Sequence, residues 1–258
     1  MVARRRFGQH FLHDPAIIGR IVAAIDPRPG DELLEIGPGR GALTGPLIAR
    51  TGRLEAIEID RDLAQRLAHQ YGAALSVHQA DALTLDFAAL AAGRLLRVCG
   101  NLPYNISTPL LFHLLESAAH IRDMHFMLQR EVVERMAASA GSRTYGRLTV
   151  MLAARCRVEK LFIVGAGAFQ PPPKVESALV RLVPHAQAPF QIAAPERFAR
   201  VVAAAFAQRR KTLRNALAGY VDTAGFLAAG VDPGRRAETV SAQEFARLAQ
   251  TPGPAPGL

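Results

Sequence analysis

Short apolar runs alternate with helical patterns along the first half of the chain, and this alternation restricts the fold more than any other feature. An apolar run followed by a helical stretch is typical of a parallel strand and its crossover, so the sequence predicts a parallel sheet covered by helices. The expected strands are Glu32–Ile36, Leu54–Ile59, Leu75–His78, Leu95–Cys99 and Met124–Leu128. The expected helices are Ala42–Arg50, Asp62–Tyr71, Thr108–Ser117 and Glu131–Ala138.

The second half of the chain has a different pattern. Two extended runs, Leu148–Val164 and Ser177–Val183, have no helical pattern between them, so they predict an antiparallel hairpin rather than a parallel pair. After the loop-like stretch Pro184–Pro195, helical patterns return at Glu196–Ala207, Leu213–Tyr220, Thr223–Ala229 and Ser241–Ala249. We therefore expect an α/β domain over residues 1–184, a small helical domain over 185–250 and a disordered tail over 251–258.

Composition excludes several classes of protein. Half of the residues are hydrophobic and 21% are charged, which is not the composition of a disordered chain. No apolar run approaches the roughly 18 residues of a membrane span. The two cysteines, Cys99 and Cys156, make no disulfide framework, so a reducing, cytoplasmic setting is expected.

The net charge of +9 favours a polyanionic partner, and nucleic acid is the first candidate. A coding bias toward arginine is the alternative, because only three of the 31 basic residues are lysine. The charge is uneven, however: residues 181–258 contain ten basic and five acidic residues, a net +5, which leaves +4 for residues 1–180. A uniform composition bias does not produce this difference in density.

A glycine-rich turn, Gly37–Gly41, follows the first expected strand of the sheet, where it would let a ligand approach the backbone. Its G-x-G-x-G spacing is neither the dinucleotide fingerprint nor a phosphate-binding loop. Glu58 and Asp81 come at the ends of the next two strands, where carboxylates can accept hydrogen bonds from ribose hydroxyls. Taken singly, these features fit a tight turn or helix caps, and Asp60 is typical of a cap. Together they predict a site for a single nucleoside and resemble the class I S-adenosylmethionine-dependent methyltransferases.

The string Asn101-Leu102-Pro103-Tyr104 ends the fourth strand and resembles the motif of methyltransferases that act on ring-conjugated amines such as adenine N6. Such an amine is a poor nucleophile because its lone pair is delocalised into the ring. The Asn101 side-chain oxygen and the Leu102 carbonyl can accept its two N–H groups, while Pro103 fixes the turn and Tyr104 offers a stacking face. The reaction needs no strong base, so no catalytic histidine and no metal are expected.

Longer strings resemble the rRNA adenine N6,N6-dimethyltransferase family, specifically its small-subunit branch, over residues 4–247. They are Arg6–Leu12, Glu35–Thr44, Asn101–Ser107, Met127–Val133, Tyr145–Leu148, Phe169–Ser177 and Phe206–Leu217. The resemblance implies the class I methyltransferase fold with a helical C-terminal domain, and S-adenosyl-L-methionine as cofactor.

The resemblance also implies residue roles. His10 and Leu12 would close over the cofactor, Glu58 would hold its ribose and Asp81 its adenine amine, and Phe169 would stack with Tyr104 on the target adenine. The full implied cofactor-binding set is His10, Leu12, Gly37, Gly39, Glu58, Ile59, Asp81, Ala82 and Asn101. The implied catalytic set is Asn101, Leu102, Pro103, Tyr104 and Phe169. The chain departs from the family at His10, where asparagine is common.

The implied substrate is a pair of adjacent adenines in the 3′-terminal hairpin loop of small-subunit rRNA, dimethylated in a pre-assembled subunit during ribosome biogenesis. The expected protein is a monomer without membrane attachment. Phosphate contacts are assigned to Arg209, Arg210, Lys211 and Arg214, although a solvated helix start would also explain them. Three alternatives are a large-subunit methyltransferase of the antibiotic-resistance type, an assembly factor with secondary methylation, and a DNA adenine methyltransferase, which lacks the later strings.

Overall fold

The computed structural model describes residues 10–252, and contacts divide them into two compact units. The first unit comprises residues 10–133 and 159–184, and the second comprises 134–158 and 185–252. Residues 134–158, which the sequence assigned to the first domain, thus belong to the second unit. Residues 1–9, and residues 253–258 of the expected tail, lie outside the described residues. No described helix has the length and apolar character that a membrane span requires.

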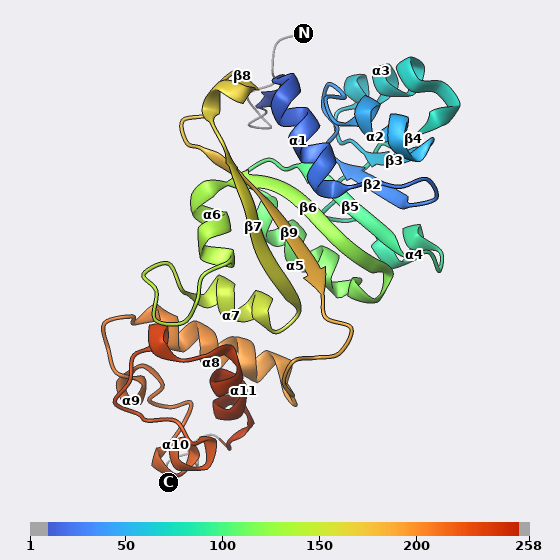
Figure 1. Ribbon diagram of the computed structural model, residues 1–258. Helices are drawn as coiled ribbons and strands as arrows, with labels where there is room; N and C mark the ends of the chain where they lie inside the picture. The colour runs from blue at the N-terminus through green and yellow to red at the C-terminus, as the bar shows by residue number, and fades with distance from the viewer. Residues whose placement is uncertain (1–9, 253–258) are drawn as a thin grey trace. The chain divides into compact units, whose positions relative to one another are not determined.

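Within residues 10–252, seven strands form one sheet in the order β4-β3-β2-β5-β6-β9-β7 (Figure 1). The first five along the chain are parallel to one another, and β9 is antiparallel to β6. β7 and β9 form a hairpin at one edge, so the predicted class I methyltransferase fold is confirmed. The strands are β2 (Glu32–Ile36), β3 (Leu54–Ile57), β4 (Leu75–His78), β5 (Leu96–Asn101), β6 (Ile121–Gln129), β7 (Cys156–Val164) and β9 (Ser177–Pro184). A separate two-stranded sheet pairs β1 (Phe11–Leu12) with β8 (Phe169–Gln170).

Helices cover both faces of the large sheet. One face packs under the first three helices in a cluster that includes Ile21, Leu47 and Leu67, and Figure 1 shows α5 behind the sheet. Asp60 caps α3 as expected, because its side chain accepts hydrogen bonds from two backbone amides. The helices are α1 (Pro15–Ile25), α2 (Thr44–Thr51), α3 (Arg61–Tyr71), α4 (Phe87–Ala91), α5 (Ser107–Glu116) and α6 (Arg130–Met136). Short 3₁₀ helices lie at Gly72–Ala74, Ala118–His120 and Ala166–Ala168.

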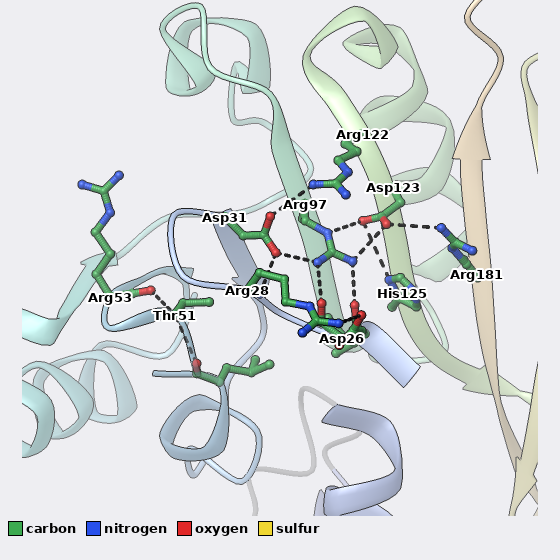
Figure 2. Close-up of polar contacts among 12 residues, drawn as sticks. Asp26, Arg28, Asp31, Thr51, Arg53, Arg97, Arg122, Asp123, His125 and Arg181 are labelled. Carbon is green, nitrogen blue, oxygen red and sulfur yellow. Dashed lines mark hydrogen bonds and ion pairs between the residues drawn. The ribbon is translucent and has the colours of Figure 1, made fainter. Parts of the chain in front are cut away.

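A buried guanidinium connects the elements around the start of β5 (Figure 2). This is the end of the strand opposite Asn101, where the sequence motif lies. Arg97 on β5 is 5% exposed and donates to both oxygens of Asp123, to Asp31, and to the carbonyls of Ile25 and Asp26. These five bonds use every N–H of the guanidinium. Because the acceptors belong to β6, the end of α1 and the turn before β2, Arg97 fixes these elements relative to one another.

The second unit is built around a helical core. Its elements are α7 (Arg147–Ala153), α8 (Pro195–Ala207), α9 (Leu213–Ala216), α10 (Thr223–Ala229), the 3₁₀ helix Ala237–Thr239 and α11 (Ala242–Gln250). Phe198, Leu213 and Phe245 lie in its hydrophobic cluster. A capping box starts α11, where Ser241 accepts from the Glu244 amide and Glu244 accepts from the Ser241 amide.

Two predictions about secondary structure are wrong in part. The extended run Leu148–Val164 contains α7 as well as β7, because Thr149 bonds back to the Gly146 amide at the helix start and Val150 is buried in the helical core. The helix predicted over Leu213–Tyr220 ends at Ala216. Beyond that point the chain turns, and Leu217 enters the same core.

Candidate functional site

A cavity opens where β2, β3 and β5 end, and it is lined by all nine residues expected to bind the cofactor. Asn101, Leu102, Pro103 and Tyr104 of the expected catalytic set line it as well. All these residues belong to the first unit, so one site gathers side chains that are far apart in the sequence. Ligand sites of open α/β sheets occupy this edge, beyond the carboxyl ends of the strands.

The glycine-rich turn is held against the end of β3 by a buried carboxylate. Glu58 is 3% exposed; its Oε2 accepts a hydrogen bond from the Gly39 amide at 3.0 Å and its Oε1 accepts from the Asp60 amide at 2.9 Å. Burial raises the pKa of Glu58, and these amide hydrogen bonds oppose the rise. The carboxylate is therefore rigidly placed at the cavity wall, where it can accept further hydrogen bonds.

Glycine is required at position 39 for two reasons. Its φ of 58° lies in the left-handed region, and a Cβ there would stand 3.2 Å from the ring of Phe11. The guanidinium of Arg40 lies over the same ring at 4.3 Å from its centroid. Phe11 therefore packs β1 against the turn, a contact that the sequence did not predict, since the expected site included only the neighbouring His10 and Leu12.

The next part of the wall combines an apolar surface with a second acid. Ile59 is 47% exposed although it is a large apolar residue, and it lines the cavity beside the buried Ala82. Asp81 is held in place because its Oδ1 accepts the Leu83 amide at 2.9 Å. An exposed isoleucine and a fixed carboxylate that line the same cavity suit a flat heterocycle that carries an amino group.

The loop after β5 comes close to the glycine-rich turn because position 100 lacks a side chain. A Cβ on Gly100 would lie 2.2 Å from the Ile36 carbonyl oxygen, so only glycine fits there. Asn101 follows directly, and its Nδ2 donates to the His10 carbonyl at 3.0 Å. Because a carbonyl can only accept, this bond orients the side-chain amide of Asn101 with Nδ2 toward His10. Within residues 10–252, no group donates a hydrogen bond to Asn101 Oδ1.

Two contacts hold the Tyr104 side chain, one at its hydroxyl and one on its ring. Its hydroxyl hydrogen bonds with Ser177 Oγ at 2.9 Å, and the His10 ring stacks on it with centroids 5.9 Å apart. His10 Nδ1 in turn donates to the Pro171 carbonyl at 2.8 Å. His10 therefore links the loop after β5, which carries Tyr104, to the segment after β8, which begins with Pro171.

Phe169 does not line the cavity. Its side chain is 2% exposed and lies in the hydrophobic cluster, and its backbone pairs with Leu12 between β8 and β1. Its expected stacking on a target base stays a prediction, and it would require the ring to leave this cluster.

Glu35 lines the cavity although it is not among the residues expected from the sequence to form the site. It is 2% exposed on β2, and its Oε2 accepts a hydrogen bond from Thr44 Oγ1 at 2.6 Å. Burial raises its pKa to about 7; the Thr44 bond opposes the rise and the charge of Glu58 adds to it. The signal in the sequence was an acid inside the otherwise apolar end of a strand.

The four basic residues expected to contact phosphates are all exposed, and all belong to the second unit. They are not equivalent. Arg209 donates to the carbonyls of Arg143 and Tyr145 and pairs with Glu238 at 3.4 Å, so it holds loops of its own unit. The remaining three are Arg210, Lys211 and Arg214.

Comparison with known proteins assigns the chain to a family. A model of the ribosomal RNA adenine dimethylase family matches residues 2–251. The ribosomal RNA small subunit methyltransferase A of Xanthomonas euvesicatoria pv. vesicatoria is 57% identical over 249 residues, covering 96% of this chain and 95% of its own. The protein of the same description from Laribacter hongkongensis is 53% identical over 253 residues, with coverages of 98% and 97%.

Two solved structures share the fold over nearly the whole chain. The 23S rRNA methyltransferase ErmE is 29% identical, with a TM-score of 0.74 and coverage of 93% of this chain and 98% of its own. A dimethyladenosine transferase from Plasmodium falciparum is 26% identical, with a TM-score of 0.76 and coverages of 93% and 96%. Since the family model spans almost every residue and both relatives are more than 50% identical to this chain in sequence, the chain belongs to the ribosomal RNA adenine dimethylase family.

Proposed function

We propose that this protein uses S-adenosyl-L-methionine to dimethylate N6 of two adjacent adenines in the 3′-terminal hairpin loop of small-subunit rRNA. The observation that carries the proposal is the orientation of Asn101, whose Nδ2 is held by the His10 carbonyl so that Oδ1 is left for a target amine. Relatives at 53% and 57% identity are described as small subunit methyltransferases, which supports this choice of RNA.

The residues of the cavity fit S-adenosylmethionine. Glu58 is a buried acceptor beside the glycine-rich turn, where it would hold the ribose hydroxyls. Asp81 would accept from the adenine amino group, and Ile59 would cover the flat face of the ring. Gly37 and Gly39 would leave room for the methionine part. When bound, the cofactor supplies a methyl group on a positively charged sulfur.

Asn101 Oδ1 and the Leu102 carbonyl would accept the two N–H groups of the adenine amine. This arrangement would favour a pyramidal nitrogen whose lone pair points toward the cofactor, which is catalysis by positioning. The lone pair held by Asn101 and Leu102 would accept the methyl group that the cofactor supplies, the sulfur would keep the electron pair of the broken S–C bond, and the nitrogen would give its proton to solvent. Tyr104, clamped by Ser177, would stack on the flipped base.

The second unit supplies the positive surface for docking on rRNA. Arg210, Lys211 and Arg214 are exposed, as phosphate contacts require, and they are close together in the sequence. We assign the docking role to the helical part after residue 184, which carries net charge beyond its share. Arg209 would contribute mainly through its hydrogen bonds to the carbonyls of Arg143 and Tyr145, which stabilise the loops of this unit.

The experiment that tests the proposal is transfer of labelled methyl groups to small subunits, large subunits, naked rRNA and DNA, run in parallel. We expect label in small-subunit rRNA and little in the other three. Label in the large subunit instead would favour the alternative suggested by the structural likeness to ErmE. The Asn101→Ala variant serves as the blank, since label that persists with it does not come from this site.

A further inference from the structure

Glu35 lies in the wall of the cavity, and the proposed function gives it no role. Its carboxyl group is 2% exposed, and the hydrogen bond to its Oε2 comes from Thr44, a neutral donor. Among the described residues, the charged group that acts most on Glu35 is another acid, Glu58. An ionised carboxylate in such a place is costly unless a cation arrives.

The groups that face Glu35 come from three elements. Glu58 follows β3, Cys99 on β5 is the register partner of Glu35, and Tyr71 belongs to α3. None of these groups carries a positive charge. Two carboxylates in one cavity disfavour each other's ionised form, and burial acts in the same direction, so the pKa of Glu35 is raised to about 7. Near neutral pH the carboxyl group is therefore poised between its two forms.

We propose that Glu35 exchanges a proton with the charge of the cofactor: it releases its proton to solvent when S-adenosylmethionine binds and takes one back once the donor has become neutral at sulfur. The proposal rests on the proposed function, because it needs a ligand whose positive charge disappears on methyl transfer. The cofactor carries one more positive charge than the product S-adenosylhomocysteine. An ionised Glu35 thus favours the cofactor, and reprotonation removes that preference, so Glu35 discriminates between the fresh and the spent cofactor.

The Thr44 hydroxyl can serve both forms of the carboxyl group: its oxygen accepts a hydrogen bond when Glu35 is protonated, and its O–H donates one when Glu35 is ionised.

The matched variant is Glu35→Gln, which keeps the shape and an acceptor for Thr44 but cannot ionise. Calorimetric titration of the full-length protein with S-adenosylmethionine at pH 7, in buffers of low and high ionisation enthalpy, measures the released protons.

We expect wild type to release about half a proton more than Glu35→Gln, since the free carboxyl is about half protonated at pH 7. The binding heat of wild type then becomes more exothermic as the buffer's ionisation enthalpy rises. Subtracting the variant cancels protons exchanged by the ligand's own amino group. Titration with S-adenosylhomocysteine should show no such difference, and binding of that product by Glu35→Gln confirms that the variant is folded.

A second measurement needs no variant. The ratio of the affinities of wild type for S-adenosylmethionine and S-adenosylhomocysteine should rise about tenfold from pH 6 to pH 8, as the ionised fraction of free Glu35 grows. Equal proton release by wild type and variant, or a ratio that does not change with pH, overturns the inference and leaves the proposed function standing. Absence of S-adenosylmethionine binding by wild type overturns both.

Discussion

The backbone carbonyl of His10 and the side-chain nitrogen of Asn101 are joined by a hydrogen bond of 3.0 Å, and this bond fixes the direction in which the Asn101 amide faces. The two residues are 91 positions apart, so the residue just before β1 sets the geometry of the loop after β5. The chemistry proposed for the site depends on this relationship, because an amide turned the other way would offer a target amine a donor instead of an acceptor.

Replacing Asn101 with alanine should therefore lower the rate of methyl transfer on the order of a hundredfold or more, because the target amine is no longer held in a reactive geometry. Single-turnover kinetics with saturating cofactor measure the effect. Asn105→Ala is the matched control, because Asn105 lies in the same loop and also lines the cavity, but the proposal gives it no contact with the amine, and its rate should stay within about twofold of wild type. Equal losses in the two variants would mean that only the loop as a whole matters.

Replacing Glu58 with alanine should weaken cofactor binding by about 1–3 kcal/mol, since the ribose hydroxyls would lose their acceptor. Loss of the bonds to the Gly39 and Asp60 amides would add to the effect. Calorimetric titration with S-adenosylmethionine gives the affinity, and Glu116→Ala on the exposed side of α5 is the control. Wild-type affinity in a folded Glu58→Ala variant would remove Glu58 from the cofactor site.

Most of the sheet could be predicted because its strands are short apolar runs with clear ends. The limits expected for the strands Glu32–Ile36 and Leu75–His78 agree with β2 and β4. Helix α7 could not be predicted, because the β-branched residues in Leu148–Val164 favour a strand and only packing in the helical core makes them helical. Tertiary contact outweighs local propensity there.

The site could be predicted where a motif combines a strand end with a polar side chain. Phe11 and Glu35 were missed for a different reason: their roles come from contacts across the fold. Phe11 matters because it packs on Gly39, and Glu35 matters because β2 buries it beside Glu58. The packing of Phe11 has no signature in a local pattern, and an acid in an apolar strand end does not by itself show that the acid lies beside Glu58. The burial of Phe169 likewise depends on the pairing of β8 with β1.

The exposed basic residues of the second unit should behave in two ways. Changing Arg210, Lys211 and Arg214 to glutamine should make the dependence of log affinity for small subunits on log salt shallower, by about one unit or somewhat less per lost phosphate contact. Arg209→Gln should lower the melting temperature instead, since Arg209 holds the carbonyls of Arg143 and Tyr145. Filter binding over a salt series and thermal unfolding separate the two effects. An unchanged slope in the triple variant would assign RNA docking to another surface.

His125 should make the protein less stable in mild acid. It is 2% exposed beside Asp123, and burial, together with the charges of Arg97 and Arg181, lowers its pKa to about 4, against an ordinary value of 6.5. Between these values the unfolded chain binds more protons than the folded one, so this group's contribution to stability falls as pH drops from 6.5 toward 4.

His125→Leu removes this dependence. The free energy of unfolding of the variant relative to wild type should therefore rise by about 2 kcal/mol between pH 7 and pH 5. Urea denaturation at the two pH values measures the change, and the difference between the proteins cancels the opposite contribution of Glu35, whose pKa is raised. A difference that stays constant with pH would show that His125 titrates in the folded protein as it does in the unfolded chain.

The methylated positions in the rRNA show directly which product the site makes and where. After incubation of unmethylated small subunits with the protein and S-adenosylmethionine, digestion of the rRNA and mass spectrometry of the fragments identify the methylated positions. We expect N6,N6-dimethyladenosine at two adjacent positions of the 3′-terminal hairpin loop, and none with Asn101→Ala. Adenosine that remains monomethylated at saturating cofactor, or dimethyladenosine found only in large-subunit rRNA, would show that the proposed function is wrong.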